Sequence, residues 1–528
     1  MARPAAAAGV KKSAATAPAK RAVAKPNGTK KAAATTKRTE SAASEKPVKS
    51  KAKRQLEEDD DNDEDEEEKV APPRAKKQKQ THKRAAPAPT TASKSAAPPT
   101  INKRPTQTLD IFVFGDGSFG ELGLGNKKIG KDSPSNVKLP RLNHKLPAKE
   151  VGVVQVACGG MHAIALTKDN KVLTWGVNDE KALGRETNWD GEEEDDDDDA
   201  GLDPTESNPG EVDLSAWSKT HQFVQVAATN SASFVLTDVG TVLGWGTFRD
   251  SNGVFGFSED VMLQVTPIKV SGLSNITALA AGSNHMLALD KSGAIFTWGS
   301  GDQYQLGRKP VSRHNGPRAT LLPAVCGRFT KAHHAVQIAA GSYHSFYIDN
   351  HKRVWSWGLN NFAQTGHIDA GGKDNAIVPS PKIVQSLKDR DIVHIDGGEH
   401  HSVACSANGE ALTWGRLDSH QLGLAVTSFT EDNTIFDEGD RPRILFEPTV
   451  IPDLTASFVV SCSDTNIAVS PKGEAYGWGF SSNRQTGLGT REDVEVPKLI
   501  QSPDVDGKKL VWAGLGGQYG MVAAVHQS

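Results

Sequence analysis

The stretch Trp245–Gly256, WGTFRDSNGVFG, opens on a Trp-Gly pair that recurs along the chain and then leaves the repeat with a polar, turn-rich excursion. The other pairs begin at Trp175, Trp298, Trp357, Trp414 and Trp478, so that successive pairs lie 70, 53, 59, 57 and 64 residues apart. A repeat of this period predicts a propeller or a solenoid. We expect function in the excursion, because a stacked scaffold holds such loops rigidly while their sequence varies.

Each Trp-Gly pair ends a copy of one pattern: a strand, a Gly-rich turn, a strand, a polar turn and a strand. The copies start at Val153, Phe223, Ile276, Ala335, Ile392 and Phe458. In the first copy, VVQVA and AIALT alternate with a period of two, and KDNK has the composition of a hairpin turn. Small residues in the first strand suit the inner edge of a blade, and the aromatic residues of the third strand fill the wider space outside it.

The two ends of the repeated region are complementary half repeats. Residues 111–125, IFVFGDGSFGELGLG, contain only the later part of a unit, and residues 510–525, LVWAGLGGQYGMVAAV, contain only the earlier part. Together they make one more blade. The sequence therefore predicts an all-β fold, a seven-bladed β-propeller over residues 106–528 that is closed by a split blade with no open edge. Surplus length is expected in loops such as the acidic insert 191–201, GEEEDDDDDAG.

Residues 1–105 have a different composition and are predicted to form a disordered, basic tail. They contain 25 Lys and Arg against 13 Asp and Glu, a net charge of +12, whereas the whole chain carries −3. Eleven carboxylates crowd into residues 57–68. Such a segment has too little apolar surface to fold alone, and charge blocks of this size are usually solvated interaction arms.

Several functional classes have no support in the sequence. The first residues lack the apolar region of a secretory signal, and no run approaches the roughly 18 apolar residues of a membrane helix, so we expect a soluble intracellular protein without a membrane partner. The four cysteines show no CxxC spacing, and we expect no metal. GxxxxGK, HExxH and GxSxG motifs are missing. We therefore expect no enzyme, no cofactor and no small-molecule substrate.

Two segments carry a resemblance to a known family. GVNDEKALGRET, Gly176–Thr187, resembles the signature of the regulator of chromosome condensation, the chromatin-bound nucleotide exchange factor for the small GTPase Ran. FRDSNGVFG, Phe248–Gly256, is similar to the family's β-wedge, which presses on the GTPase near its phosphate-binding loop. The resemblance covers the whole propeller. It implies an exchange factor that generates Ran-GTP for nucleocytoplasmic transport and mitotic control, with wedge contacts from Phe248, Arg249, Asp250, Ser251, Asn252 and Gly253.

A second candidate surface is the turn after each inner strand, which reads Gly, two variable residues and then often His. We interpret His162, His285, His344 and His401 as structural side chains that bond a neighbouring blade. The residue before this position varies, as expected of a recognition ring: Met161, Ser231, Asn284, Tyr343, His400, Thr465 and Gln518. The resemblance implies GTPase contacts from Met161, Asn230, Asn284, Tyr343 and His400. Asn284 and Asn230 stand where the family has acidic residues, so we expect the ring to carry less charge.

The remaining partners follow from the tail and one loop. Lys and Arg spaced by Ala, Pro and Ser resemble histone tails, which bind DNA phosphates without reading sequence. RAKKQKQTHKR, residues 74–84, resembles a nuclear import signal and implies an import receptor. In the family an arginine loop grips the nucleosome, and RKPVSRHNGPR offers Arg308, Arg313 and Arg318 for that role. A nuclear, chromatin-associated protein is thus expected.

Other functions of this kind of propeller remain to be separated. A chromatin adaptor with weak or no exchange activity stays open, because Asn284 and Asn230 are neutral. The plant ultraviolet-B photoreceptor resembles this fold but uses tryptophans at the ring turns, and the ring turns here contain none.

Overall fold

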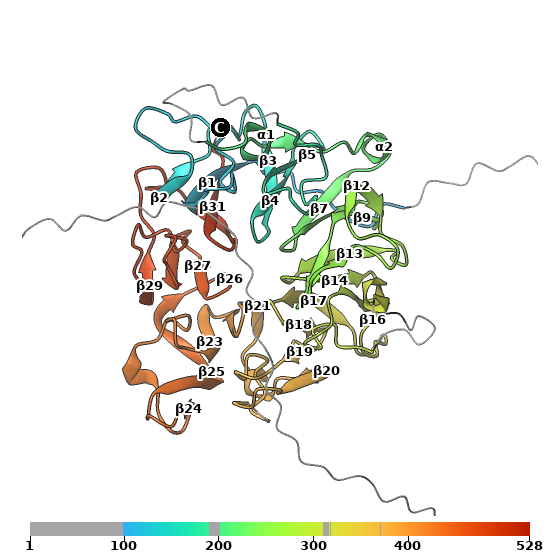
Figure 1. The fold of residues 1–528 in the computed structure, drawn as a ribbon. Helices are drawn as coiled ribbons and strands as arrows, with labels where there is room; N and C mark the ends of the chain where they lie inside the picture. The colour runs from blue at the N-terminus through green and yellow to red at the C-terminus, as the bar shows by residue number, and fades with distance from the viewer. Residues whose placement is uncertain (1–98, 190–200, 310–315, 317, 370, 528) are drawn as a thin grey trace, which may run out of the picture. The chain divides into compact units, whose positions relative to one another are not determined.

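The structure is a computed structural model that describes residues 99–189, 201–309, 316, 318–369 and 371–527. In these residues, seven sheets of four or five antiparallel strands form the blades of a β-propeller, and a two-stranded hairpin stands apart from them (Figure 1). The predicted all-β class and the seven blades are confirmed. The tail up to residue 98 and most of the acidic insert lie outside the described residues.

Each blade is named here by its order along the chain, and its strands run from the inside outward. Blade 1 contains β3 (Val153–Cys158), β4 (His162–Thr167), β5 (Val172–Gly176) and β6 (Gly210–Glu211). Blade 2 contains β7 (Phe223–Ala228), β8 (Ala232–Thr237), β9 (Val242–Gly246) and β12 (Gln264–Lys269). Blade 3 contains β13 (Ile276–Ala281), β14 (His285–Asp290), β15 (Ile295–Gly299) and β16 (Ala324–Val325). Blade 4 contains β17 (Ala335–Ala340), β18 (His344–Asp349), β19 (Val354–Leu359) and β20 (Ile377–Ile383).

The remaining blades vary this plan. Blade 5 has five strands, β21 (Ile392–Gly397), β22 (His401–Ser406), β23 (Glu410–Arg416), β25 (Pro442–Thr455) and β24 (Thr434–Phe436). Blade 6 contains β26 (Phe458–Cys462), β27 (Thr465–Val469), β28 (Ala475–Gly479) and β29 (Val494–Leu499). Blade 7 contains β30 (Leu510–Leu515), β31 (Tyr519–Val525), β1 (Leu109–Asp116) and β2 (Asn136–Leu142). Two short α-helices lie on either side of β6: α1 (Pro204–Ser207) follows the third strand of blade 1, and α2 (Ser215–Ser218) follows its fourth strand.

Blade 7 combines strands from both ends of the described chain. β1 pairs with β31 in an antiparallel register that runs from Leu109 opposite Val525 to Gly115 opposite Tyr519. The seven inner strands, β3, β7, β13, β17, β21, β26 and β30, each contact the inner strand of both neighbouring blades. They surround a central channel. Inside the described residues, no helix has the length and apolar character needed to cross a membrane.

Neighbouring blades are joined by a repeated chain of side-chain hydrogen bonds. His344 Nε2 in blade 4 lies 2.8 Å from Ser402 Oγ in blade 5. Ser402 Oγ donates to the carbonyl of Gln364 at 2.8 Å, and Trp414 Nε1 donates to that same carbonyl at 2.9 Å. We call this chain of groups the blade relay. It recurs as His162, Ser233, Ala182 and Trp245, as His285, Ser345, Gln305 and Trp357, and as His401, Asn466, Gln421 and Trp478.

The blade relay confirms that the repeated histidines are structural. Burial lowers the pKa of His162 to about 4 and that of His285 to about 3, so both imidazoles are neutral at physiological pH. Glycines make room for the tryptophans: a Cβ on Gly184 would lie 2.5 Å from Trp245 Nε1, and the φ of +64° there also favours glycine. The Trp-Gly repeat therefore specifies both the strand and its contact with the preceding blade.

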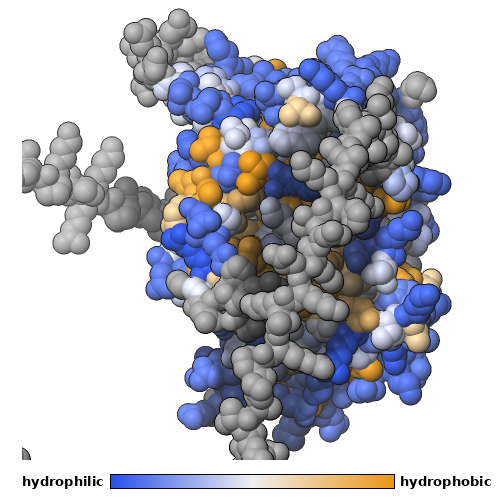
Figure 2. Space-filling view, turned by 90° about the vertical axis from the view of Figure 1, so that its right-hand side faces the viewer, coloured by the Kyte–Doolittle hydropathy of each residue, from blue (hydrophilic) through white to orange (hydrophobic). Residues whose placement is uncertain are grey.

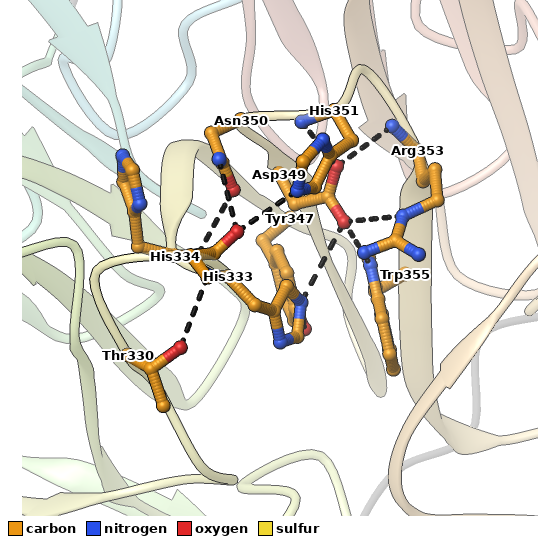
Figure 3. A network of polar contacts seen from close by, with 10 residues as sticks. Thr330, His333, His334, Tyr347, Asp349, Asn350, His351, Arg353 and Trp355 are labelled. Carbon is orange, nitrogen blue, oxygen red and sulfur yellow. Dashed lines mark hydrogen bonds and ion pairs between the residues drawn. The ribbon is translucent and has the colours of Figure 1, made fainter.

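The hairpin turns between the second and third strands of each blade gather on the face opposite the ring turns. There Asp349, whose side chain is fully buried, accepts hydrogen bonds from Arg353 Nε at 2.7 Å and Trp355 Nε1 at 2.9 Å (Figure 3). Burial alone would raise the pKa of Asp349, but the hydrogen bonds from Arg353, Trp355 and His351 outweigh it and hold this pKa below its usual range. His333 points toward the same carboxylate, so the connection before blade 4 is fastened to this turn.

Residues 101–104, which we call the strap, are bonded to this same face. Asn102 Nδ2 donates to the carbonyls of Thr237 at 3.0 Å and Ile276 at 2.8 Å, which belong to blades 2 and 3. Arg104 Nη1 donates to Gln222 Oε1 at 3.0 Å. The last residues before the propeller's first strand are thus part of the folded structure.

The side of the propeller that faces the viewer in Figure 2 is mainly hydrophilic, and hydrophobic side chains form only small separate areas on it. Exposed apolar residues on outer strands include Ile268 on β12, at 37%, and Val325 on β16, at 43%. Scattered residues of this kind are normal on a soluble protein and do not define a binding site.

Among the described residues that line the central channel there is one carboxylic acid, beside the thiols of Cys158 and Cys462. Asp396 on β21 occupies the place that Ala157, Ala227, Ala280 and Ala339 hold in other blades. Its Oδ2 accepts a hydrogen bond from the backbone N–H of Ser461 on the adjacent inner strand at 3.0 Å. Desolvation nevertheless raises the pKa of Asp396 to about 7. A carboxyl in this position favours its neutral form in the folded protein.

Asp396→Asn should stabilise the protein above neutral pH and not below pH 4. Because the folded-state pKa of Asp396 is raised above the ordinary 3.8, the wild-type protein loses stability as pH rises from about 4 through about 7. The amide cannot ionise and escapes this loss. Melting temperatures of both proteins between pH 4 and pH 9 test this: the advantage of the variant should grow up to about pH 7 and then stay constant. A difference that does not change with pH would contradict the assignment.

Candidate functional site

The ring turns of all seven blades share one backbone hydrogen bond, which defines the ring positions. In blade 1 the residue after the Trp-Gly pair, Val177, donates its N–H to the carbonyl of Met161 at 3.0 Å. The same bond reaches the carbonyls of Ser231, Asn284, Tyr343, His400, Asp464 and Gln518 in the other blades. These seven residues therefore occupy equivalent places at one end of the propeller, which we call the ring face.

The ring position in blade 6 is Asp464 and not Thr465, as the sequence had suggested. β26 and β27 are joined by a tighter turn, with Cys462 directly paired to Thr465. Thr465 is therefore the first residue of a buried strand, and its Oγ1 donates to the carbonyl of Phe480 at 2.7 Å. The signal for this shift is that the copy beginning at Phe458 is two residues shorter than the others.

The correction at blade 6 changes the charge expected of the ring face. Asn230 precedes the ring position of blade 2 and is exposed, and its N–H donates to the carbonyl of Ser283 at 2.8 Å. Glu399 is the matching residue in blade 5, and its N–H donates to the carbonyl of Ser463. Burial and the nearby Asp464 raise the pKa of Glu399. The ring is thus neutral at Asn230 and Asn284 but acidic on blades 5 and 6.

Tyr343 and His400 form an aromatic sector of the ring face. The His400 ring stacks on Phe362 with centroids 5.0 Å apart and lies 6.0 Å from the Tyr343 ring. Burial, followed by the charge of Arg416, lowers the pKa of His400 to about 4. Burial also raises the pKa of Tyr343. Both side chains are neutral at physiological pH, so they present aromatic contact area and hydrogen-bonding groups without charge.

The predicted wedge is a two-stranded hairpin that follows β9 of blade 2. β10 (Phe248–Asp250) pairs with β11 (Gly253–Gly256), and Ser251 and Asn252 form the exposed turn. Asp250 Oδ1 accepts a hydrogen bond from the Asn252 N–H at 2.7 Å and so shapes the tip. Gly253 has a φ of +114°, and a Cβ there would meet no atom within 4 Å. The glycine is required by the backbone conformation, and the tip is open to a partner.

Phe248 is the root of the hairpin. The sequence predicted that Phe248 contacts a partner, but its side chain is completely buried and is not part of the exposed surface. Its ring centroid lies 6.0 Å from that of Phe234 and 6.4 Å from that of Phe257. The exposed part of the hairpin therefore begins at Arg249.

Three acceptor side chains from other parts of the ring face hold the hairpin. Asn284 Oδ1, at the ring position of blade 3, accepts the main-chain N–H of Arg249 at 3.1 Å. Glu180, in the loop after β5 of blade 1, forms an ion pair with Arg249 through Oε1 and Nη1. Asp302, in the loop after β15, lies 3.5 Å from the N–H of Ser251. Neither Glu180 nor Asp302 was predicted from the sequence to contact the hairpin, although Glu180 lies within the segment Gly176–Thr187 that resembles the family signature.

Met161, Asn230 and the foot of the hairpin meet in one pocket of the ring face. The pocket is also lined by Glu180 and Arg249. The structure therefore brings the wedge residue Arg249 together with three ring residues, Met161, Asn230 and Asn284, whereas Tyr343 and His400 line a separate sector.

The arginine loop is only partly available for a partner. Arg308 directs its guanidinium inward, where Nη2 donates to the carbonyls of Thr297 at 2.8 Å and Leu322 at 2.7 Å. This matches Arg185 in blade 1, whose Nη2 donates to the Thr174 carbonyl at 3.0 Å. Arg308 is thus a structural residue and not a free cation. Arg318 Nη1 donates to the carbonyl of Glu259 at 3.3 Å, and Arg313 lies outside the described residues.

Comparison with known proteins assigns the family. The model of the RCC1-like domain matches residues 110–522. The guanine nucleotide exchange factor SRM1 of Saccharomyces cerevisiae is 37% identical over 439 residues, which cover 80% of this chain and 88% of SRM1. The crystal structure of Prp20p from the same yeast, described with its binding to Gsp1p and histones, is 36% identical with a TM-score of 0.72, over 80% of this chain and 92% of Prp20p. A second structure, yeast RCC1 (Prp20) bound to Kap60, is 35% identical with a TM-score of 0.72, over 85% of this chain and 97% of the other. The chain therefore belongs to the RCC1 family, the regulators of chromosome condensation.

Proposed function

We propose that this protein is a guanine nucleotide exchange factor for the small GTPase Ran, that it is bound to chromatin, and that it generates Ran-GTP in the nucleus. The observation that carries the proposal is the wedge: a hairpin with an exposed tip, rooted by Phe248 and held by Asn284 at a ring position. A relative named as an exchange factor matches 80% of this chain.

The mechanism requires differential binding and no covalent chemistry. An exchange factor that binds the nucleotide-free GTPase more tightly than the loaded form lowers nucleotide affinity by the same factor. The wedge tip, Asp250 to Gly253, would supply contacts that only the open phosphate-binding loop can accept. The ring face would supply the remaining affinity: Glu399 and Asp464 suit a basic surface of the GTPase, and Tyr343 and His400 add neutral contact area.

The chromatin and import functions belong to other parts of the chain. Residues 1–98 carry the excess of Lys and Arg that would bind DNA phosphates through counterion release, and residues 74–84 would bind an import receptor. Arg318 remains a candidate for a nucleosome contact, with Arg313 in the same loop. The strap itself, residues 101–104, is bonded to the face opposite the ring.

A chromatin-binding adaptor with weak or no exchange activity is the second candidate. The observation that favours it is the neutral side chain at both Asn230 and Asn284, where the resemblance to the family implies acidic residues. Exchange assays on Ran distinguish the two functions directly.

The double variant Asp250→Ala, Asn252→Ala should slow exchange at least tenfold, because the wedge tip makes the contacts that the loaded GTPase cannot. Its stability should change by less than about 0.5 kcal/mol, since both side chains are at an exposed turn. Release of a fluorescent guanine nucleotide from Ran gives the rate, and thermal melting gives the stability. The matched control Asp169→Ala, Lys472→Ala alters exposed turns on the opposite face and should behave as wild type. Normal exchange by the tip variant would show that the hairpin is not the wedge.

Asn284→Asp should raise the exchange rate and make it more sensitive to salt. A carboxylate keeps the acceptor for the Arg249 N–H, strengthens that bond by its charge, and adds attraction for a basic partner. Asn284→Ala removes the acceptor and should lower the rate. Exchange by the three proteins, measured on Ran at two salt concentrations, is the test, and an unchanged or lower rate for Asn284→Asp would contradict a limiting role for charge at this position.

Two truncations should separate the tail from the strap. A chain of residues 99–528 should retain full exchange on Ran while losing most DNA and nucleosome affinity at physiological salt, because the basic residues supply it. A chain of residues 106–528 should also melt at a lower temperature, since the bonds of Asn102 and Arg104 are lost. Equal nucleosome binding by full-length protein and residues 99–528 would show that the tail is not the chromatin anchor.

A further inference from the structure

The wedge is too small to hold its own shape. Its two strands contain three and four residues, and an isolated hairpin of this size is at best marginally stable in water. Phe248 anchors only the root, and Ser251 and Asn252 at the tip are exposed. Groups from neighbouring blades must therefore hold the middle of the hairpin. Otherwise the wedge would lose conformational entropy each time it bound a partner, and binding would be weaker.

Arg249 is the residue through which the hairpin is held. Its main-chain N–H is bonded to Asn284 of blade 3, and its guanidinium is bonded to Glu180 of blade 1. The hairpin is thus tied to the blades on both sides of blade 2. The side chain of Glu180 is only 17% exposed, whereas that of Arg249 is 46% exposed. The ion pair is partly shielded from water, so it is stronger than a pair on an open surface.

Glu180 has little else to fix it. Its second oxygen, Oε2, is buried and has no hydrogen-bond partner among the described residues. This carboxylate lies in the pocket at the foot of the hairpin, beside Met161 and Asn230. The position of the Glu180 carboxylate therefore depends on its ion pair with Arg249, and the position of the Arg249 guanidinium depends on the same ion pair. A buried carboxylate with an unpaired oxygen needs an explanation, and its ion pair with Arg249 provides one.

We propose that Glu180 is a positioning residue for nucleotide exchange: through Arg249 it fixes the wedge in the conformation that engages the GTPase. This inference rests on the proposed function. Arg249 is occupied by Glu180, so the contacts to the GTPase come from the tip beyond it, Asp250 to Gly253. Asp302 gives a weaker second support at the Ser251 N–H.

The experiment is a double-mutant cycle with kinetics on Ran. Glu180→Gln keeps the shape of the side chain and removes its charge, and should lower kcat about fivefold, the size expected for loss of a partly shielded ion pair, with little change in KM. Arg249→Gln should give a similar loss. The double variant should be no slower than the slower single variant, because Glu180 acts only through Arg249. Amide hydrogen exchange at residues 251–254 should become faster in all three.

Glu211→Gln is the matched control. It breaks the Lys171–Glu211 ion pair of 2.7 Å, which lies in the same blade and has both side chains about half exposed, and it should leave exchange unchanged.

The outcomes distinguish this inference from the proposed function. Wild-type kcat and unchanged amide exchange in Glu180→Gln would overturn the inference while leaving the exchange function standing. If the decreases in kcat caused by the two single substitutions multiplied in the double variant, the inference would also be overturned, because Glu180 would then contact the GTPase independently of Arg249. A rise in KM alone would assign Glu180 to docking and likewise overturn a positioning role. Absence of exchange by the wild-type protein would instead contradict the proposed function, and unchanged amide exchange in Glu180→Gln would then show independently that the ion pair does not order the hairpin.

Discussion

The blade relay is the contact on which the rest of the propeller depends. Four of the seven blade interfaces join a neutral histidine of one blade to a side chain of the next, and through it to a loop carbonyl that also receives a tryptophan. The histidine Nε2, the serine or asparagine side chain and the tryptophan N–H of this chain are all bonded across the blade interface, so a blade that rotated or slipped would leave several of these groups unpaired at once. The relay thus sets the spacing between blades and, with it, the positions of the ring residues.

The wedge is placed where the blade relay is replaced by apolar packing. At the interface of blades 2 and 3, Ala232 stands where the four relay interfaces have histidine, and Met286 stands where they have serine or asparagine. Phe248 packs into the cluster formed there with Phe234 and Trp298. Neither Ala232 nor Met286 carries a polar group in its side chain, so the side-chain hydrogen bonds of the blade relay are replaced here by the aromatic packing around Phe248.

Much of the fold and part of the site could be predicted from the sequence. The six Trp-Gly pairs and the complementary half repeats at the two ends were sufficient for seven blades, because the tryptophan of the repeat forms both the strand and the interblade bond. The wedge was found because it breaks the repeat. Asp464 was missed, since a repeat shortened by two residues does not reveal which turn contracts. The roles of Glu180 and Arg308 could not be predicted either. Glu180 turns toward the hairpin of blade 2, whereas Arg308 turns back toward its own blade. The spacing of residues along the sequence does not show in which direction a side chain points.

Blade 7 brings the beginning and the end of the propeller side by side, with the His526 N–H bonded to the Thr108 carbonyl at 2.9 Å. Sequence order is therefore nearly irrelevant to the finished ring. If a short linker joined residue 527 to residue 106 and the chain were opened instead at the turn between β22 and β23, every strand would keep its neighbours, and blade 5 would become the one assembled from two ends. Such a circular permutant would place new termini far along the ring from the wedge. A propeller of this kind is best regarded as a closed circle of interfaces in which the break in the covalent chain can be moved.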